Sequence, residues 1–149
     1  MKKVLFGLAV TSLAYLPVGA QGVQKPGVPA VVLNAFQQQF PKARQVEWER
    51  NRDGNYEVEF DNGIFGRDHE VIISPEGKVL RHEEELASYS LPDAVKKAIE
   101  TEFGGYRVDD VKKIDAGGTI TYAVDLDSRH GDLDVIFAAD GTIVKERMD

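Results

Sequence analysis

The stretch Val71-Ile72-Ile73-Ser74-Pro75-Glu76-Gly77-Lys78-Val79 is matched, 64 residues further along the chain, by Val135-Ile136-Phe137-Ala138-Ala139-Asp140-Gly141-Thr142-Ile143. Each stretch has an apolar run, a Glu-Gly or Asp-Gly step and a further apolar residue, which is the pattern of two strands joined by a tight turn. Glycine at that step supplies the positive φ that such a turn needs. The chain therefore contains an internal repeat, and each copy ends in a β-hairpin.

A helix is predicted at the start of each copy. At a shift of 63 residues Pro29 falls on Pro92, and one apolar set falls on another. Both sets have the i, i+3, i+4, i+8 spacing of one helix face; they are Val32, Ala35, Phe36 and Phe40, and Val95, Ala98, Ile99 and Phe103. Proline suits the first turn of a helix, while Pro41 and Gly104-Gly105 follow as stop signals. Two helices of about three turns each are predicted.

Between each helix and its hairpin, apolar and polar residues alternate. The apolar members include Val46, Trp48, Tyr56, Val58 and Phe60 in the first copy, and Ile120, Tyr122, Val124 and Leu126 in the second. Alternation with period two predicts antiparallel strands with one buried and one solvated face, so the aromatic residues Trp48, Tyr56, Phe60, Tyr122 and Phe137 are expected in the core.

The predicted fold class is α+β. It consists of two tandem helix-plus-four-strand antiparallel units that share one curved sheet, with both helices on one face. A shared sheet is favoured because a unit of about 60 residues buries too little surface by itself. Two independent units on a linker are the alternative.

The N-terminus has the three-part layout of a secretory signal peptide. Lys2 and Lys3 precede an apolar run, residues 4–16, and the small-residue step Val18-Gly19-Ala20 follows. The run is too short to cross a bilayer. We therefore predict a periplasmic or secreted protein with no membrane contact after cleavage. The predicted segments are a signal peptide at 1–20, a flexible leader at 21–28 and repeats at 29–85 and 86–149, with residues 81–89 as the connector.

Composition limits the possible functions. The chain has no cysteine, which excludes disulfides, metal–thiolate sites and thiol nucleophiles. Lys and Arg number 18 against 25 Asp and Glu, and this acidity disfavours nucleic acid and anionic membranes as partners. No phosphate-binding loop, nucleophile elbow or His-Glu-x-x-His motif occurs. We expect a protein without a cofactor and without catalytic activity.

The residues of the second copy resemble the PepSY-like family of small exported bacterial proteins. The resemblance rests on Leu91–Ile99 leading to Phe103, followed by a hairpin and the run Asp140–Glu146. The first copy, from Val28-Pro29 to Glu76–Leu80, resembles a second member of the same family. The resemblance implies the fold of the beta-lactamase inhibitor protein, a curved sheet with one open, concave face. It also implies a role in binding or restraining peptidases, with no residue assigned to that role.

The open face of the predicted sheet is expected to be acidic. Its outward-facing acids, which we predict to bind a protein or peptide partner of basic character, are Glu57, Glu59, Asp61, Asp125, Asp127, Asp132 and Asp134. Complementary charge would speed association with such a partner, although ordinary solubility explains the same pattern. A few cations, such as Arg50, Lys112 and Lys113, are expected among these acids.

Two further sets of polar residues are candidates for other chemistry. The alternative function is Ca²⁺ or small-ligand binding by Asp125, Asp127, Asp132 and Asp134, because close carboxylates suit calcium; their spacing matches no EF-hand loop. His69, His82 and His130 are scattered, and we expect solvent-exposed side chains with no ligand role. Tyr89 and Tyr106 lie in predicted loops and are the aromatic residues freest to contact a partner.

Overall fold

The computed structural model describes residues 27–63, 66–129 and 131–148. The predicted signal peptide at 1–20 lies outside these residues, as does the predicted leader up to residue 26. Within the described part of the chain, no helix is both long and apolar enough to span a membrane.

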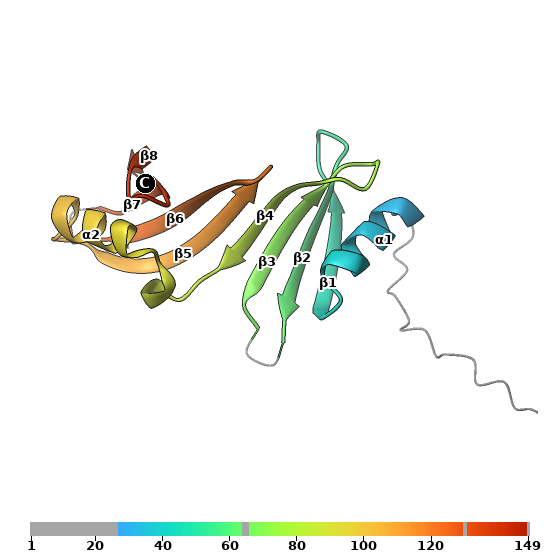
Figure 1. Ribbon diagram of the computed structural model, residues 1–149, viewed down its shortest axis with the longest axis horizontal. Coiled ribbons are helices and arrows are strands. Elements are labelled where there is room, and N and C mark those ends of the chain that lie inside the picture. Colours follow the sequence, from blue (N-terminus) through green and yellow to red (C-terminus); the bar gives the residue numbers. More distant parts are fainter. Residues whose placement is uncertain (1–26, 64–65, 130, 149) are drawn as a thin grey trace, which may run out of the picture.

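The described residues form two α-helices and eight strands. In chain order these are α1 (Ala30–Gln39), β1 (Ala43–Arg50), β2 (Tyr56–Asn62), β3 (Asp68–Ile73), β4 (Val79–Glu85), a short 3-10 helix η1 (Ser88–Ser90), α2 (Asp93–Glu102), β5 (Arg107–Ala116), β6 (Thr119–Asp127), β7 (Leu133–Ala138) and β8 (Ile143–Met148). Every strand pairs antiparallel with its neighbours in the sequence, which gives one eight-stranded sheet in the order β1 to β8 (Figure 1).

These elements confirm the predicted α+β class with one antiparallel sheet and two helices, and the alternative of two independent units on a linker is wrong. The prediction of a connector at residues 81–89 is also wrong. Residues 81–85 belong to β4, whose hydrogen bonds to β5 make the sheet continuous.

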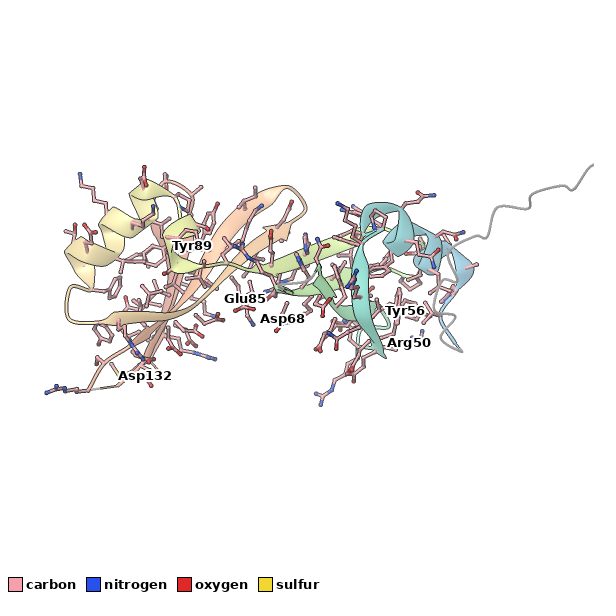
Figure 2. The ribbon with its side chains drawn as sticks, turned by 90° about the horizontal axis from the view of Figure 1, so that it is seen from below. Arg50, Tyr56, Asp68, Glu85, Tyr89 and Asp132 are labelled. Carbon is pink, nitrogen blue, oxygen red and sulfur yellow. The ribbon has the colours of Figure 1, made fainter. Side chains whose placement is uncertain are left out.

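Both helices lie on the same face of the sheet. Val71, in the core under α1, lies opposite His82, and His82 lies opposite Asp115. Side chains two or four residues apart on a strand share a face, so Asp115 shares a face with Val111, which belongs to the core under α2. Figure 2 shows α1 and α2 on this common side. We call this side the helix face and the opposite, uncovered side the open face.

Each helix covers its own hydrophobic cluster. The cluster under α1 is aromatic, with the ring of Phe36 5.2 Å from that of Trp48 and 5.1 Å from that of Phe60. The cluster under α2 is mostly aliphatic and comprises Leu91, Val95, Ile99, Phe103, Val111, Val124, Leu126, Leu133, Val135 and Phe137. Burying one such side chain contributes about 1.5–3 kcal/mol. The aromatic residues predicted for the core are buried, apart from Tyr122, which packs half-buried against it.

The two clusters share no residue, so the pairing of β4 with β5 connects the halves. This joint places Glu85 opposite Lys112, Glu84 opposite Lys113 and His82 opposite Asp115. Opposite charges across an antiparallel pair are favourable. Three of the four pairs of the joint thus set an acid or imidazole on β4 opposite a charged group of β5 that complements it, and the fourth pairs Glu83 with Ile114.

The joint exists because the second copy has the longer first strand. Trp48 pairs with Val58, and Val111 pairs with Val124, so Trp48 and Val111 are equivalent positions. Beyond Val111, β5 continues to Ala116 and uses this extension to pair with β4. Beyond Trp48, β1 ends at Arg50 and a turn follows. The first copy therefore lacks the strand segment that makes the joint.

The repeated Glu-Gly and Asp-Gly turns pack directly under the helices. Gly77 and Gly141 have φ angles of 85° and 86°. A Cβ atom on Gly77 would lie 3.0 Å from the carbonyl oxygen of Val31, and one on Gly141 would lie 2.6 Å from that of Ala94. Helix backbone cannot move aside as a flexible side chain can. Glycine is therefore required at both turns for its conformation and for its lack of a side chain.

We expect Gly141→Ala to destabilise the protein more than Gly118→Ala does. Gly118 has a similar φ of 88°, but a Cβ there meets nothing within 4 Å. Gly118→Ala should cost about 1–2 kcal/mol for the backbone conformation alone, and Gly141→Ala at least about 1 kcal/mol more for the overlap with α2. Urea unfolding of both variants measures this difference. Equal losses would contradict the proposed close approach of the turn to α2.

Candidate binding surface

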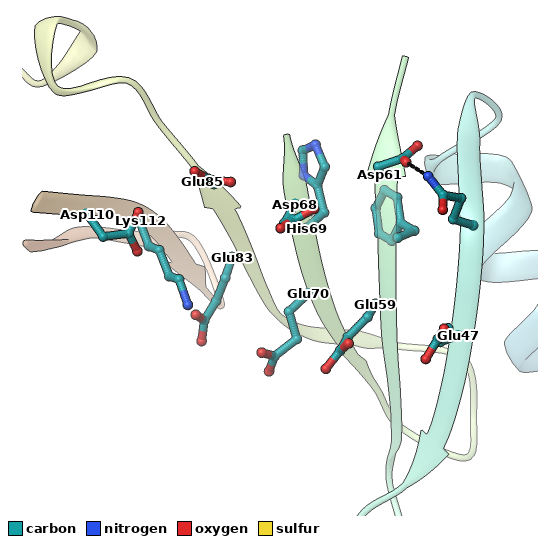
Figure 3. A pocket seen from close by; sticks show the side chains of 12 residues that line it. Glu47, Glu59, Asp61, Asp68, His69, Glu70, Glu83, Glu85, Asp110 and Lys112 are labelled. Carbon is teal, nitrogen blue, oxygen red and sulfur yellow. Dashed lines mark hydrogen bonds between the residues drawn. The ribbon is translucent and has the colours of Figure 1, made fainter. Parts of the chain in front are cut away.

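Four glutamates form a row across the open face of β1 to β4. Glu47 lies opposite Glu59, Glu59 opposite Glu70, and Glu70 opposite Glu83, so each of four neighbouring strands contributes one carboxylate. Figure 3 shows these four side chains pointing to the same side of the sheet. We call this row the glutamate ladder. Directly opposed side chains on neighbouring strands have Cβ atoms about 4.5–5.5 Å apart, and like charges at this spacing are destabilising.

Strand alternation places the ladder on the open face. Glu47 precedes the buried Trp48, and Glu59 lies between the buried Val58 and Phe60. Glu70 lies between the buried His69 and Val71 in the same way. Because these neighbours point into the core under α1, the three glutamates must point to the opposite side, and Glu83 shares that side because it lies directly opposite Glu70. The hydrophobic core therefore fixes the position of the carboxylates.

The chain supplies little positive charge to the ladder. Among the described residues, no ion pair reaches Glu47, Glu59 or Glu70, whereas Glu83 is paired with Arg81. Burial and the neighbouring acids Glu83, Glu57 and Glu59 raise the pKa of Glu70, and Arg81 only partly opposes them. The middle of the ladder is thus a site where negative charge is unfavourable in the protein as it stands.

The ladder lines an open hollow of about 590 Å³. Asp61, Asp68, Glu85 and Asp110 add further carboxylates to its wall, and Lys112 is the single lysine or arginine among the described residues that line it (Figure 3). The side-chain amide of Gln45 donates a hydrogen bond to Asp61 across the bulge in β1. The hollow is open to solvent and lined mainly by carboxylates, which suits positively charged side chains of a partner.

The second copy carries a related row. The buried pair Val58–Val71 corresponds to the buried pair Val124–Val135, so the next pair, Glu59–Glu70, corresponds to Asp125–Asp134. Asp134 in turn lies opposite Arg147, whose Nε donates a 3.0 Å hydrogen bond to its carboxylate. The last position of this row is therefore an arginine where the ladder has Glu83.

Charge on the open face is uneven as a result. Burial, followed by the nearby Asp134 and Asp110, raises the pKa of Asp125, while Lys112 lowers it. A second hollow of about 500 Å³ over this half has Ile114, Ala123 and Ile136 in its lining, together with Arg81, Lys112, Lys145 and Arg147. The face is strongly acidic over β1 to β4 and mixed in charge over β5 to β8.

The predicted site residues are only partly brought together. Glu59, Asp61, Asp125 and Asp134 line the two hollows, and Glu57 lies on the same face opposite Ile72. Asp127 accepts a 2.8 Å hydrogen bond from Arg107, and Asp132 accepts one of 3.3 Å from the backbone N–H of Ser128. Three of the four aspartates considered for calcium, Asp127, Asp132 and Asp134, therefore have separate partners, and Asp125 lies opposite Asp134. The described residues contain no group of three or more His, Asp or Glu side chains arranged to hold a metal ion.

Several predicted placements on the two faces are wrong. Arg50 lies beside Tyr56, with Cζ 5.9 Å from the ring centroid, and Lys113 lies opposite Tyr122. Both tyrosines point to the helix face, so Arg50 and Lys113 lie on that face and not on the open face. Lys112 lies on the open face as predicted. Eight residues of the two hollows were not predicted from the sequence: Glu47, Glu70, Glu83, Glu85, Asp68, Asp110, Lys145 and Arg147. The acids of β1 and β3 among them could have been found from their alternation with core residues.

The predicted exposure of the histidines is also wrong for His69 and His82. His69 is only 7% exposed and His82 is half-buried, because both occupy the helix-face phase of their strands. His130 lies outside the described residues. Tyr89 is 76% exposed, as predicted, whereas Tyr106 is half-buried and packs against the second cluster.

Comparison with known proteins agrees with this architecture. A family model described as "Putative beta-lactamase-inhibitor-like, PepSY-like" matches residues 20–81 and again residues 79–145. The chain belongs to this PepSY-like family. The two matches show that the chain contains two tandem PepSY-like repeats, which account for nearly all of the described residues. No sequence among the curated proteins matches the chain.

Solved structures from Bacteroides have a similar fold. A DUF2874 family protein from Bacteroides uniformis is 22% identical, with a TM-score of 0.71 over 80% of this chain and 88% of that one. A protein of Bacteroides eggerthii, named as one of the "putative periplasmic proteins", is 18% identical, with a TM-score of 0.72 over 81% and 88% of the two chains. A BLIP-like protein from Bacteroides fragilis is 23% identical, with a TM-score of 0.67 over 80% and 85%. At these identities the likeness concerns the fold alone.

We expect Glu70→Gln to stabilise this PepSY-like protein at neutral pH. A folded-state pKa above the ordinary value contributes stability below that value, which is lost as pH rises through the folded pKa. Removing the charge should raise the unfolding free energy at pH 7 by about 0.5–1 kcal/mol, and the gain should disappear near pH 3. Glu76→Gln, in an exposed turn, removes the same charge as a control. Urea unfolding at both pH values measures the unfolding free energy of the two variants. Equal changes in Glu70→Gln and Glu76→Gln would contradict the account.

Proposed function

We propose that this PepSY-like protein is a non-catalytic binding module that engages a basic protein or peptide through the open face of its sheet. The observation that carries the proposal is the glutamate ladder, four directly opposed carboxylates on a face that neither helix of the described residues covers. A partner that placed lysine or arginine side chains over this row would supply positive charge where, among the described residues, an ion pair reaches Glu83 alone.

The energetic cost of the ladder supports a role in binding. Like charges opposed across strands reduce the stability of the folded protein, and solubility does not require them to lie in register. A complementary partner would relieve this repulsion on binding and would also be attracted from a distance. The acidic part of the face then sets the orientation of the bound partner. The mixed-charge part over β5 to β8 offers apolar contact through Ile114 and Ile136.

We further propose that the partner is an enzyme restrained by this module, with a peptidase as the first candidate. The family description and the name "BLIP-like protein" given to the Bacteroides fragilis structure support an inhibitor-like role. The same beta-lactamase-inhibitor-like family description supports a non-catalytic role for the module itself.

The proposed site of action is the periplasm or the exterior of the cell. The tripartite layout of residues 1–20 supports export, and cleavage after Ala20 would leave Gln21 as the first residue of the mature chain. Mass spectrometry of the protein recovered from the periplasm or medium should give the mass of residues 21–149. Recovery of the full-length chain from the cytoplasm would contradict this proposal.

The ladder proposal predicts a selective loss of binding. The triple variant Glu47→Gln, Glu59→Gln, Glu70→Gln should weaken binding of an isolated partner at least tenfold, because it removes the opposed charges without touching the core. The control variant Glu76→Gln, Glu100→Gln, Glu102→Gln makes the same change in net charge at exposed positions elsewhere.

The measurement is affinity capture from an extract of the exported fraction, followed by titration calorimetry with each captured protein at two salt concentrations. Wild type and control should capture the same partner, and raised salt should weaken that binding. A partner that binds the ladder variant and the control with equal affinity would exclude the ladder as the contact surface.

A further inference from the structure

Two histidines face each other on the helix face, between β3 and β4. The Nδ1 atom of His69 lies 3.0 Å from the Nε2 atom of His82, within hydrogen-bond distance. The two rings are nearly parallel, with centroids 5.3 Å apart. One of the facing nitrogens must donate a proton and the other must accept it. The pair therefore ties β3 to β4 through a side-chain hydrogen bond.

The pair is enclosed by aromatic rings at the end of α1. The ring of Phe60 on β2 stacks on His69 at 4.9 Å, and the ring of Phe40 lies edge-on to His82 at 5.0 Å. Phe40 is the C-cap residue that directly follows α1. The histidines thus belong to the edge of the first hydrophobic cluster, at the side nearest the joint between the halves.

Charged groups of both signs face the pair from the surrounding strands. Glu84 and Asp68 favour a charged His69, and Arg67 opposes it. His82 lies opposite Asp115 of β5, and it is also near Glu84 and Lys113. Burial outweighs the carboxylates and lowers the pKa of both rings, and His69 lowers that of His82 further.

Proton counting shows when the hydrogen bond can exist. The neutral pair has one facing N–H and one facing lone pair. A single added proton can reside on the outer nitrogen of the donating ring, which leaves the hydrogen bond intact. Two added protons place an N–H on both facing nitrogens, so that no acceptor remains and two positive charges adjoin.

We propose that His69 and His82 form an acid-sensitive clasp on β4, which holds the strand with zero or one bound proton and releases it when the second proton binds. The next side chains along β4, Glu83 and Glu85, point to the open face and line the acidic hollow. Opening of the clasp therefore loosens both the end of the glutamate ladder and the strand that joins the halves. Mild acid therefore changes the position of Glu83 and Glu85 on the open face by loosening β4.

The direction of the pH effect follows from the lowered pKa values. The unfolded chain takes up two protons at these histidines near pH 6.5, while the folded chain resists the second. Stability contributed by the neutral pair is present above pH 6.5 and is lost as pH falls through the folded pKa values. Glu70 and Asp125, whose pKa values are raised, act in the opposite direction, so a comparison between variants at each pH is needed.

Histidine NMR titration tests the clasp. In a His130→Gln background only His69 and His82 remain, and we expect two separate steps, with the second below 6.5. Adding His69→Gln leaves His82 without a like charge beside it, so its single step should move up toward 6.5. Two independent steps at 6.5 in the background protein, or no change on adding His69→Gln, would overturn the proposal.

Thermal unfolding provides a second readout that does not depend on assigning resonances. The double variant His69→Gln, His82→Gln should lose less stability on acidification than wild type, so the difference in Tm between the two should shrink by at least about 4 °C from pH 7 to pH 5. A constant difference would mean that the pair is structural only, and this too would overturn the clasp.

Discussion

The pairing of β4 with β5 is the interaction on which the rest of the structure depends. Each helix covers a hydrophobic cluster of its own, and the two clusters have no residue in common. Without the pairs that run from His82–Asp115 to Glu85–Lys112, the halves would be joined only through η1. Because residues that lie opposite each other on paired strands point to the same side, the core-facing side of the first half is also the core-facing side of the second. Both helices must therefore lie on one side of the sheet. A continuous open face on the other side is the direct consequence.

That continuous face is where the chain places its charge. Core residues under the helices occupy the helix-face phase of the strands, so the residues of the other phase all point to the same, opposite side of the sheet. In the first repeat this phase holds the glutamate ladder, and in the second it holds Asp125, Asp134 and Arg147. The same pattern thus occurs twice with a different last residue. The open face is therefore acidic at one end and mixed in charge at the other, and a partner can recognise this difference.

Much of this architecture could be predicted from the sequence. The repeated hairpin, the helical apolar spacing and the strand alternation each reflect a local rule, and all three predictions agree with the structure. A strand was predicted to begin at Val79, but its continuation to Glu85 and its pairing with β5 were missed. Near the joint its helix-face residues are His82 and Glu84, so both faces of the strand are polar and no apolar alternation marks it. The exposure of the histidines was misjudged for the same reason. The ladder could not be predicted either, since it depends on register, and the bulges in β1 and between Ile72 and Ile73 shift that register in ways that spacing alone does not reveal.

The central claim is that the glutamate ladder holds negative charge that the described part of the chain neutralises only at its Glu83 end. Carbon-13 NMR titration of the glutamate side-chain carboxyls in the mature protein measures this directly. The account predicts that the pKa of Glu70 lies above its ordinary value of 4.5 and moves back toward it when Glu83 is replaced by glutamine. A pKa for Glu70 at or below 4.5 would show that the chain's own cations already compensate the ladder, and would contradict the account.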